Sequence, residues 1–227
     1  LRMLLQKIED IRIMVVVNGI VGNNTHRKLE VGEFRGFVLV DEYAPLIFVN
    51  GSDGKAAQMF TLAHELAHIW YGFSAAFDLK ELQPAEHEYE RVCNLAAAEF
   101  LVPKTELREL WSSVSKDLDR FQKVARHFKV SEIVAARRSL DLGFITKQEF
   151  FDFYQDRLSR ELQTDQGDGG GNFYATQMFR VGRRFAEAVI RATLEGKLLY
   201  SEAYRLTGLK GKTFSEFAER LGFGGDV

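Results

Sequence analysis

Two histidines and a glutamate in the segment Phe60–Trp70 have the spacing of a metal site. They are His64, Glu65 and His68, in the pattern His-Glu-x-x-His. Positions i and i+4 lie on one face of a helix, so both imidazoles can reach one metal ion, at about 2.0–2.1 Å from each nitrogen. Glu65 is then held beside the metal without binding it, where it can take a proton from an activated water and pass it to a leaving amine. We therefore predict His64 and His68 as metal ligands and Glu65 as the catalytic base.

A tetrahedral site with an open position needs a third protein ligand. The candidates lie on the next predicted helix and are Glu86, Glu88, Glu90, Glu99 and His87. Glu90 is favoured because Asn94 follows it at i+4, where it can support the site by a hydrogen bond to a ligand histidine. We expect zinc, and manganese also suits a site of two histidines and a carboxylate. The donor for a developing oxyanion stays open among His26, Tyr71, His87 and Arg91.

Two helices and a small sheet are predicted to position these residues. Lys55–Phe73 has apolar residues at helical spacing and no proline, and Ser52 or Asp53 is suited to cap it. A second helix is expected from about Ala85 to Leu101, ending before Pro103. Three apolar segments are predicted as strands, the last two joined by a hairpin turn, with a loop over residues 18–33: Ile11–Val17, Phe34–Val40 and Leu46–Asn50.

The rest of the chain is predicted to be helical. Phe121–Leu142 resembles a helix-turn-helix, with a break near Val130 and a second helix capped by Ser131. Its basic residues could contact DNA, although a solvated face is the more common explanation of such a pattern. They are Arg120, Lys123, Arg126, His127, Lys129, Arg137 and Arg138. A charged helix is expected over 146–164, a Gly-rich linker over 165–171 and a helical module after it.

The two motifs together resemble the ImmA/IrrE family of bacterial metallopeptidases. That family pairs the zinc helix with a downstream E-x-x-x-N-x-x-A-A-E-x-L-x-P stretch, matched here from Glu90 to Pro103 except that Val102 stands where methionine is frequent. The resemblance implies a gluzincin-like core, with His64, His68 and Glu90 as ligands and Glu65 as base. It also implies cleavage of a repressor that controls stress-response or mobile-element genes. Members often carry an N-terminal helix-turn-helix of the phage-repressor type. We expect such a domain before Leu1, and DNA would be a partner through it.

These observations predict an α+β fold with a small zincin-like sheet, the motif-bearing helix, further helices and a helical C-terminal module. The predicted divisions are a metallopeptidase domain at 1–110, a helix-turn-helix-like region at 111–164, the linker at 165–171 and the module at 172–227. A single cysteine, Cys93, a net charge of −2 and no apolar run long enough to cross a bilayer favour a cytoplasmic protein without membrane contact. The leading function is a zinc endopeptidase acting on a protein partner. The alternative is a regulator or toxin–antitoxin component that uses the metal fold for sensing or binding without strong hydrolysis.

Overall fold

The fold is described from a computed structural model, which describes residues 1–22, 24–72, 86–161 and 173–224 of the 227-residue chain. Within these ranges the chain forms two compact units. We call residues 1–54, 68–72 and 173–224 the sheet unit, and residues 55–67 and 86–161 the helical unit. The division between the two units falls inside one continuous helix, α2 (Lys55–Tyr71), which therefore contributes residues to both.

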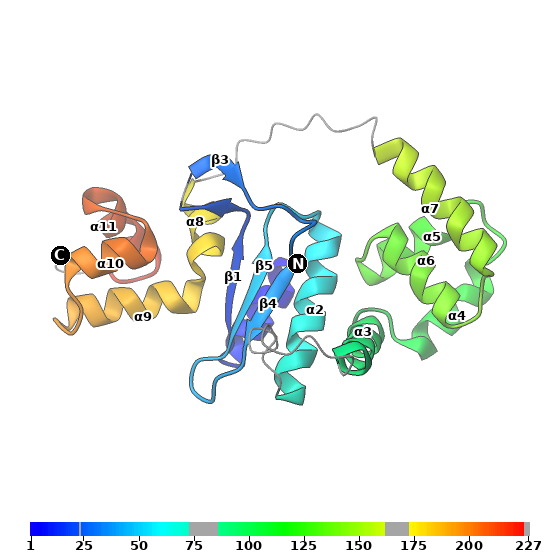
Figure 1. Ribbon diagram of the computed structural model, residues 1–227, viewed down its shortest axis with the longest axis horizontal. Coiled ribbons are helices and arrows are strands. Elements are labelled where there is room, and N and C mark those ends of the chain that lie inside the picture. Colours follow the sequence, from blue (N-terminus) through cyan, green and yellow to red (C-terminus); the bar gives the residue numbers. More distant parts are fainter. Residues whose placement is uncertain (23, 73–85, 162–172, 225–227) are drawn as a thin grey trace. The chain divides into compact units, whose positions relative to one another are not determined.

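A three-stranded sheet with the order β1-β5-β4 organises the sheet unit (Figure 1). β1 (Met14–Asn18) runs parallel to β5 (Leu46–Asn50), and β4 (Gly36–Leu39) pairs antiparallel with β5. The register places Met14 opposite Leu46 and Gly36 opposite Val49. Burial alternates along β1, since Val15 and Val17 are buried while their neighbours are half-exposed, which is the pattern of strands that bury one face. The helix α1 (Arg2–Asp10) precedes β1 and contacts it.

The start of β1 and the segment after it differ from the predictions. The predicted strand began at Ile11, but Ile11 is 57% exposed and Arg12 has a φ of 71°, because residues 11–13 form the turn that ends α1. The predicted loop over residues 18–33 contains a hairpin of β2 (Ile20–Val21) and β3 (Asn24–Lys28). All five residues of β3 are exposed, so this strand has no apolar alternation that a sequence pattern could reveal.

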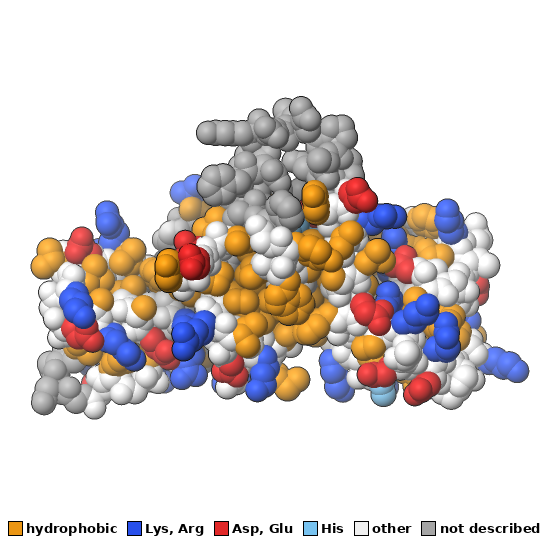
Figure 2. Space-filling model, turned by 90° about the horizontal axis from the view of Figure 1, so that it is seen from below, with side chains coloured by type: hydrophobic (Ala, Val, Ile, Leu, Met, Phe, Trp, Pro, Cys, Tyr) orange, Lys and Arg blue, Asp and Glu red, His pale blue; other side chains and the backbone are white. Residues whose placement is uncertain are grey.

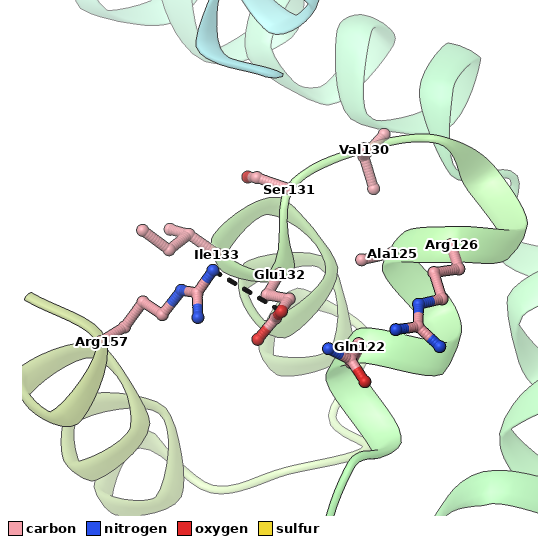
Figure 3. Close-up of a pocket in the computed structure, with 8 residues that line it drawn as sticks. All are labelled: Gln122, Ala125, Arg126, Val130, Ser131, Glu132, Ile133 and Arg157. Atoms are coloured by element: carbon pink, nitrogen blue, oxygen red, sulfur yellow. Dashed lines mark ion pairs between the residues drawn. The ribbon is translucent and has the colours of Figure 1, made fainter. Parts of the chain in front are cut away.

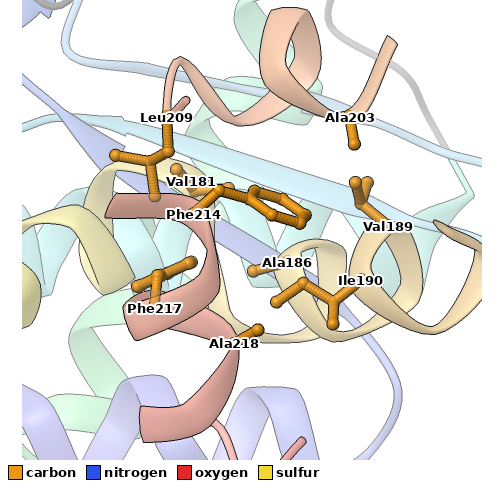
Figure 4. Close-up of a cluster of buried hydrophobic side chains, with 9 residues drawn as sticks. All are labelled: Val181, Ala186, Val189, Ile190, Ala203, Leu209, Phe214, Phe217 and Ala218. Atoms are coloured by element: carbon orange, nitrogen blue, oxygen red, sulfur yellow. The ribbon is translucent and has the colours of Figure 1, made fainter. Parts of the chain in front are cut away.

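The C-terminal helices complete the sheet unit. They are α8 (Phe173–Val181), α9 (Arg183–Leu194), α10 (Tyr200–Thr207) and α11 (Gly211–Arg220). Their shared core includes Ile190, Phe214 and Phe217, which converge between the helices in Figure 4. Both α8 and α9 contact β1, and the glycine between them, Gly182, lies so close to the strand that a Cβ there would be 2.6 Å from the Val15 carbonyl oxygen. The C-terminal module is thus packed directly on the sheet.

The helical unit contains five further helices besides its part of α2. They are α3 (Glu86–Leu101), α4 (Lys104–Val114), α5 (Arg120–Phe128), α6 (Glu132–Asp141) and α7 (Lys147–Glu161). Its aromatic core is built on Phe121, Ile145 and Phe150, with Trp111 packed against them.

In Figure 2 hydrophobic side chains gather over the region of the sheet, whereas charged side chains are frequent over the helices. The predicted α+β class, with a small sheet, a motif-bearing helix and a helical C-terminal module, is confirmed.

Candidate metal centre

The start of α2 is fixed by the loop that follows β5. Asn50 is fully buried, donates from Nδ2 to the Phe34 carbonyl at 3.1 Å and accepts at Oδ1 from the Ser52 amide at 3.0 Å. The Ser52 hydroxyl donates to the Gly19 carbonyl at 2.9 Å. Ser52 therefore ties this loop to the end of β1 and does not cap the helix as predicted. Asp53 is not the cap either, because the N-cap residue is Gly54 and no side chain caps α2.

The helix α2 carries the His-Glu-x-x-His motif on a largely buried segment. Leu62, Leu66 and Ala67 are each at most 3% exposed, and the alanine- and leucine-rich sequence favours the helix. The helix ends at Tyr71, two residues before the predicted end. Gly72 adopts a φ of 75°, a left-handed conformation that glycine reaches without steric cost. The motif thus lies in the middle of a continuous helix, where His64 and His68 are one turn apart on the same face.

The second motif brings Glu90 to the histidines. Glu90 lies on α3, and its Oε2 is 2.9 Å from Nε2 of His64. The ligand atoms offered by His64, His68 and Glu90 all lie within 4.8 Å of one another. Of the predicted ligand candidates that the structure describes, Glu90 is the one that joins the two histidines in this group. The side chains of Glu86 and His87 lie outside the described residues.

Asn94 contacts the same histidine from one turn further along α3. Its Oδ1 lies 3.1 Å from Nδ1 of His64. Because this oxygen can only accept, the contact places a proton on Nδ1 and leaves Nε2 to face the Glu90 carboxylate. A lone pair on Nε2 and a carboxylate oxygen at 2.9 Å repel each other unless a proton or a metal cation lies between them. The arrangement therefore suits a cation at this point.

Glu65 lies between the two histidines and is buried. It is 6% exposed, and its Oε2 accepts no hydrogen bond from the described residues. Burial, with a further contribution from the Glu90 carboxylate, raises the pKa of Glu65 to about 8. A cation beside it would favour the charged form and lower this pKa. Two imidazoles, a carboxylate and an unpartnered buried carboxyl oxygen together fit a metal ion and a proton-accepting group next to it.

Two other residues of α3, Glu99 and Cys93, are explained by their contacts and burial without a role at the metal. Glu99 forms an ion pair with Arg138 of α6 and accepts from the Lys104 amide at 3.1 Å, so its carboxylate is engaged at the end of the helix. Cys93 is 1% exposed, and burial, together with the carboxylates of Glu90 and Glu65, raises the pKa of its thiol to about 11. A thiol with that pKa stays protonated at neutral pH, as expected for a buried helix residue and not for a nucleophile.

The helix-turn-helix-like segment is formed by α5 and α6 as predicted, with Ser131 accepting at Oγ from the Val134 amide at 3.1 Å. A small pocket of about 280 Å³ lies at its turn, where Arg157 of α7 points toward Glu132 at 3.6 Å (Figure 3). Several basic side chains of the helix-turn-helix-like segment form ion pairs within the protein: Arg120 with Glu149, Lys123 with Asp117 and Asp119, and Arg137 with Asp141. Arg138 is 5% exposed and donates to the Val102 carbonyl. These contacts favour a packing role for the segment over DNA contact.

The α+β fold and the donor set on α2 and α3 define the class of the protein as a metallopeptidase-type domain. A peptidase family model, described as the IrrE N-terminal-like domain, matches residues 21–140. The match covers more than half of the 227 residues, and the chain belongs to this family. The family of metallopeptidases predicted from the two motifs is thus confirmed. Because the match begins at residue 21, it does not support the expected N-terminal helix-turn-helix.

A second model, for a domain of unknown function (DUF8813), matches residues 181–220, which include the whole of α9, α10 and α11. No curated protein matches the chain. Among the described residues, no helix has both the length and the apolar character that crossing a membrane requires.

Proposed function

We propose that the chain is a zinc-dependent endopeptidase that cleaves a specific protein partner. The observation that carries this proposal is the convergence of His64, His68 and Glu90, whose ligand atoms lie within 4.8 Å of one another, beside the buried Glu65. Membership of the metallopeptidase family supports it independently. Zinc is the proposed metal because two imidazoles and one carboxylate are a frequent catalytic zinc set.

The proposed roles follow from the positions of the side chains. His64, His68 and Glu90 would hold the metal, and Asn94 would orient His64 through Nδ1. Zinc bound there supplies Lewis-acid activation of a water molecule and of the scissile carbonyl. The Glu65 carboxylate accepts a proton from the attacking water and then donates it to the leaving amine nitrogen.

The proposed substrate is a DNA-binding repressor, so that cleavage would release stress-response or mobile-element genes. This finer step rests on the resemblance to the ImmA/IrrE family. A regulator that binds its partner without strong hydrolysis is the alternative. The two are separated by Glu65→Gln, which removes the base and keeps the ligands.

Metal content tests the proposed site directly. The full chain, a Glu90→Ala variant and a Glu88→Ala control are purified, loaded with zinc and analysed by elemental mass spectrometry. Glu88 is exposed on the same helix, two residues before Glu90, and is absent from the ligand group. We expect about one zinc per chain in the wild type and the control, and a sharp fall in Glu90→Ala. A wild-type protein that takes up no zinc would refute the peptidase, and zinc retained by Glu90→Ala would assign the third ligand to another residue.

Cleavage is tested in cells that produce either the wild type or Glu65→Gln. New protein N-termini are identified by mass spectrometry after labelling of free amines. We expect at least one new N-terminus, in a repressor, with the wild type and none with Glu65→Gln. A Glu65→Gln protein that keeps its zinc and still releases the repressed genes would favour the non-hydrolytic regulator.

A further inference from the structure

A cleft of about 730 Å³ lies within the helical unit, between α3 and α6. The apolar side chains that line it come from three helices: Phe60 of α2, Leu95 and Ala98 of α3, and Ile133 and Val134 of α6. Leu95 is 50% exposed although it lines this cleft. An apolar side chain entering the cleft would cover surface that is otherwise left in contact with water, which is favourable.

The cleft is continuous with the candidate metal centre. Glu90 and Asn94 line it, and the same two side chains contact His64 at 2.9 and 3.1 Å. Phe60 stacks on the His64 ring with the ring centroids 6.5 Å apart, so it forms a wall shared by cleft and metal group. A polypeptide bound at the metal centre would therefore place a side chain within reach of the cleft.

One unbalanced positive charge remains in the lining. Arg137 pairs with Asp141 at 3.0 Å, and Arg138 pairs with Glu99, which is outside the lining. Arg91 is exposed and forms no ion pair with the residues that the structure describes. Glu90 is the remaining acidic group of the lining, and it is committed to the proposed metal. Arg91 is thus the group in the lining to which a carboxylate can pair.

We propose that this cleft is the substrate subsite next to the metal centre, and that it takes an apolar side chain of the substrate polypeptide while Arg91 pairs with an adjacent acidic residue. The inference rests on the proposed function and names the class of sequence that the peptidase would select. Phe60, Leu95 and Ala98 then determine specificity by excluding water from the bound side chain, and Arg91 by charge.

Binding of short peptides to the zinc-loaded full chain tests the subsite without cleavage, in a Glu65→Gln background. The probes are four blocked hexapeptides, Gly-Gly-X-Z-Gly-Gly, with Leu or Ser at X and Asp or Lys at Z. Dissociation constants are measured from the amide shifts of the protein by NMR. We expect the Leu-Asp peptide to bind most tightly. Replacing Leu by Ser should weaken binding at least about tenfold, because the apolar burial is lost.

Two variants examine the two parts of the subsite. Ala98→Phe narrows the cleft and should weaken the Leu peptides at least about tenfold. Arg91→Glu should reverse the preference between the Leu-Asp and Leu-Lys peptides, by about two- to fivefold for each peptide, which is the range of an exposed ion pair. A misfolded variant cannot produce such a reversal. Arg108→Glu, an exposed arginine of α4 outside the cleft, is the matched control and should keep the wild-type preference.

The outcomes separate this inference from the proposed function. Zinc bound as expected with peptide binding that is absent, or unaffected by Ala98→Phe and Arg91→Glu, overturns the subsite and leaves the peptidase. Absence of zinc with peptide binding that follows the predicted pattern supports the cleft as a peptide site and refutes only the peptidase.

Discussion

Glu99 of α3 forms an ion pair with Arg138 of α6, although the two side chains differ greatly in exposure, at 55% and 5%. Arg138 also donates from Nε to the Val102 carbonyl at 3.0 Å, and Val102 is fully buried. One guanidinium thus joins the end of the ligand-bearing helix to α6. Arg138 also lines the cleft whose lining includes Glu90 and Asn94, so the pair holds together the two helices that shape this side of the candidate site.

Replacing Arg138 by glutamine should destabilise the protein by about 1–3 kcal/mol, mainly because the buried Val102 carbonyl is left without its donor, with a smaller contribution from the lost pair with the half-exposed Glu99. The neighbouring Arg137→Gln is the matched control. Arg137 is 64% exposed and forms an i,i+4 pair with Asp141, so its loss should change stability by no more than about 0.5 kcal/mol. Urea unfolding followed by circular dichroism measures both. Equal effects of the two substitutions would contradict the anchoring role of Arg138.

Gly182 should be intolerant of any side chain. Its φ is 80°, and a Cβ would lie 2.6 Å from the Val15 carbonyl oxygen of β1. Gly182→Ala should cost at least about 2–4 kcal/mol, from left-handed strain together with overpacking. Gly196→Ala isolates the first contribution, because Gly196 has a φ of 69° and nothing within 4 Å of its Cβ position. The control should cost only about 1–2 kcal/mol. Thermal unfolding of both variants is the measurement, and equal losses would show that the contact with β1 is not tight.

The sequence predicted the helices around the site well because their signals are local. Pro103 marks the end of α3 at Leu101, and Ser131 caps α6 as expected. Strand β5 was predicted with its observed bounds, since its apolar residues stand between two turns. The approach of Glu90 to His64 depends on how α3 packs, which no pattern within either helix specifies. The preference for Glu90 came instead from its polar partner Asn94 at i+4. This spacing can be recognised in the sequence because the proposed ligand and its supporting residue lie on one face of the same helix.

Other features depend on contacts between distant segments and could not be predicted. The parallel pairing of β1 with β5 joins strands separated by the hairpin and by β4. Gly182 appeared in the sequence as one glycine among 19, and only its approach to Val15 explains it. Arg138 was grouped with exposed basic residues because helical periodicity does not reveal that Glu99 and Val102 surround it. The division of the chain at residues 110, 164 and 171 stays a prediction.

Asn94→Ala should weaken zinc binding about 10- to 100-fold, the usual range for a residue that orients a ligand histidine. The reason is the contact of 3.1 Å between Asn94 Oδ1 and His64 Nδ1, which fixes the tautomer that presents Nε2. Zinc affinity is measured by competition with a coloured chelator. Glu88→Ala, on the same helix, should keep the wild-type affinity. An unchanged affinity in Asn94→Ala would show that His64 is oriented without this hydrogen bond.

The metal-free protein should lose stability with rising pH because of Glu65. Burial raises the pKa of Glu65 in the folded state from 4.5 to about 8. Between these values the unfolded chain releases the proton while the folded chain keeps it, so the contribution of this group is fully present below pH 4.5 and is lost as the pH approaches 8. Glu65→Gln removes this titration. Measured by urea unfolding with a chelator present, the variant should gain on the order of 2–4 kcal/mol relative to the wild type between pH 5 and pH 8. Parallel pH profiles of the two proteins would contradict the raised pKa. Zinc should shrink the difference, because a cation beside Glu65 stabilises its charged form.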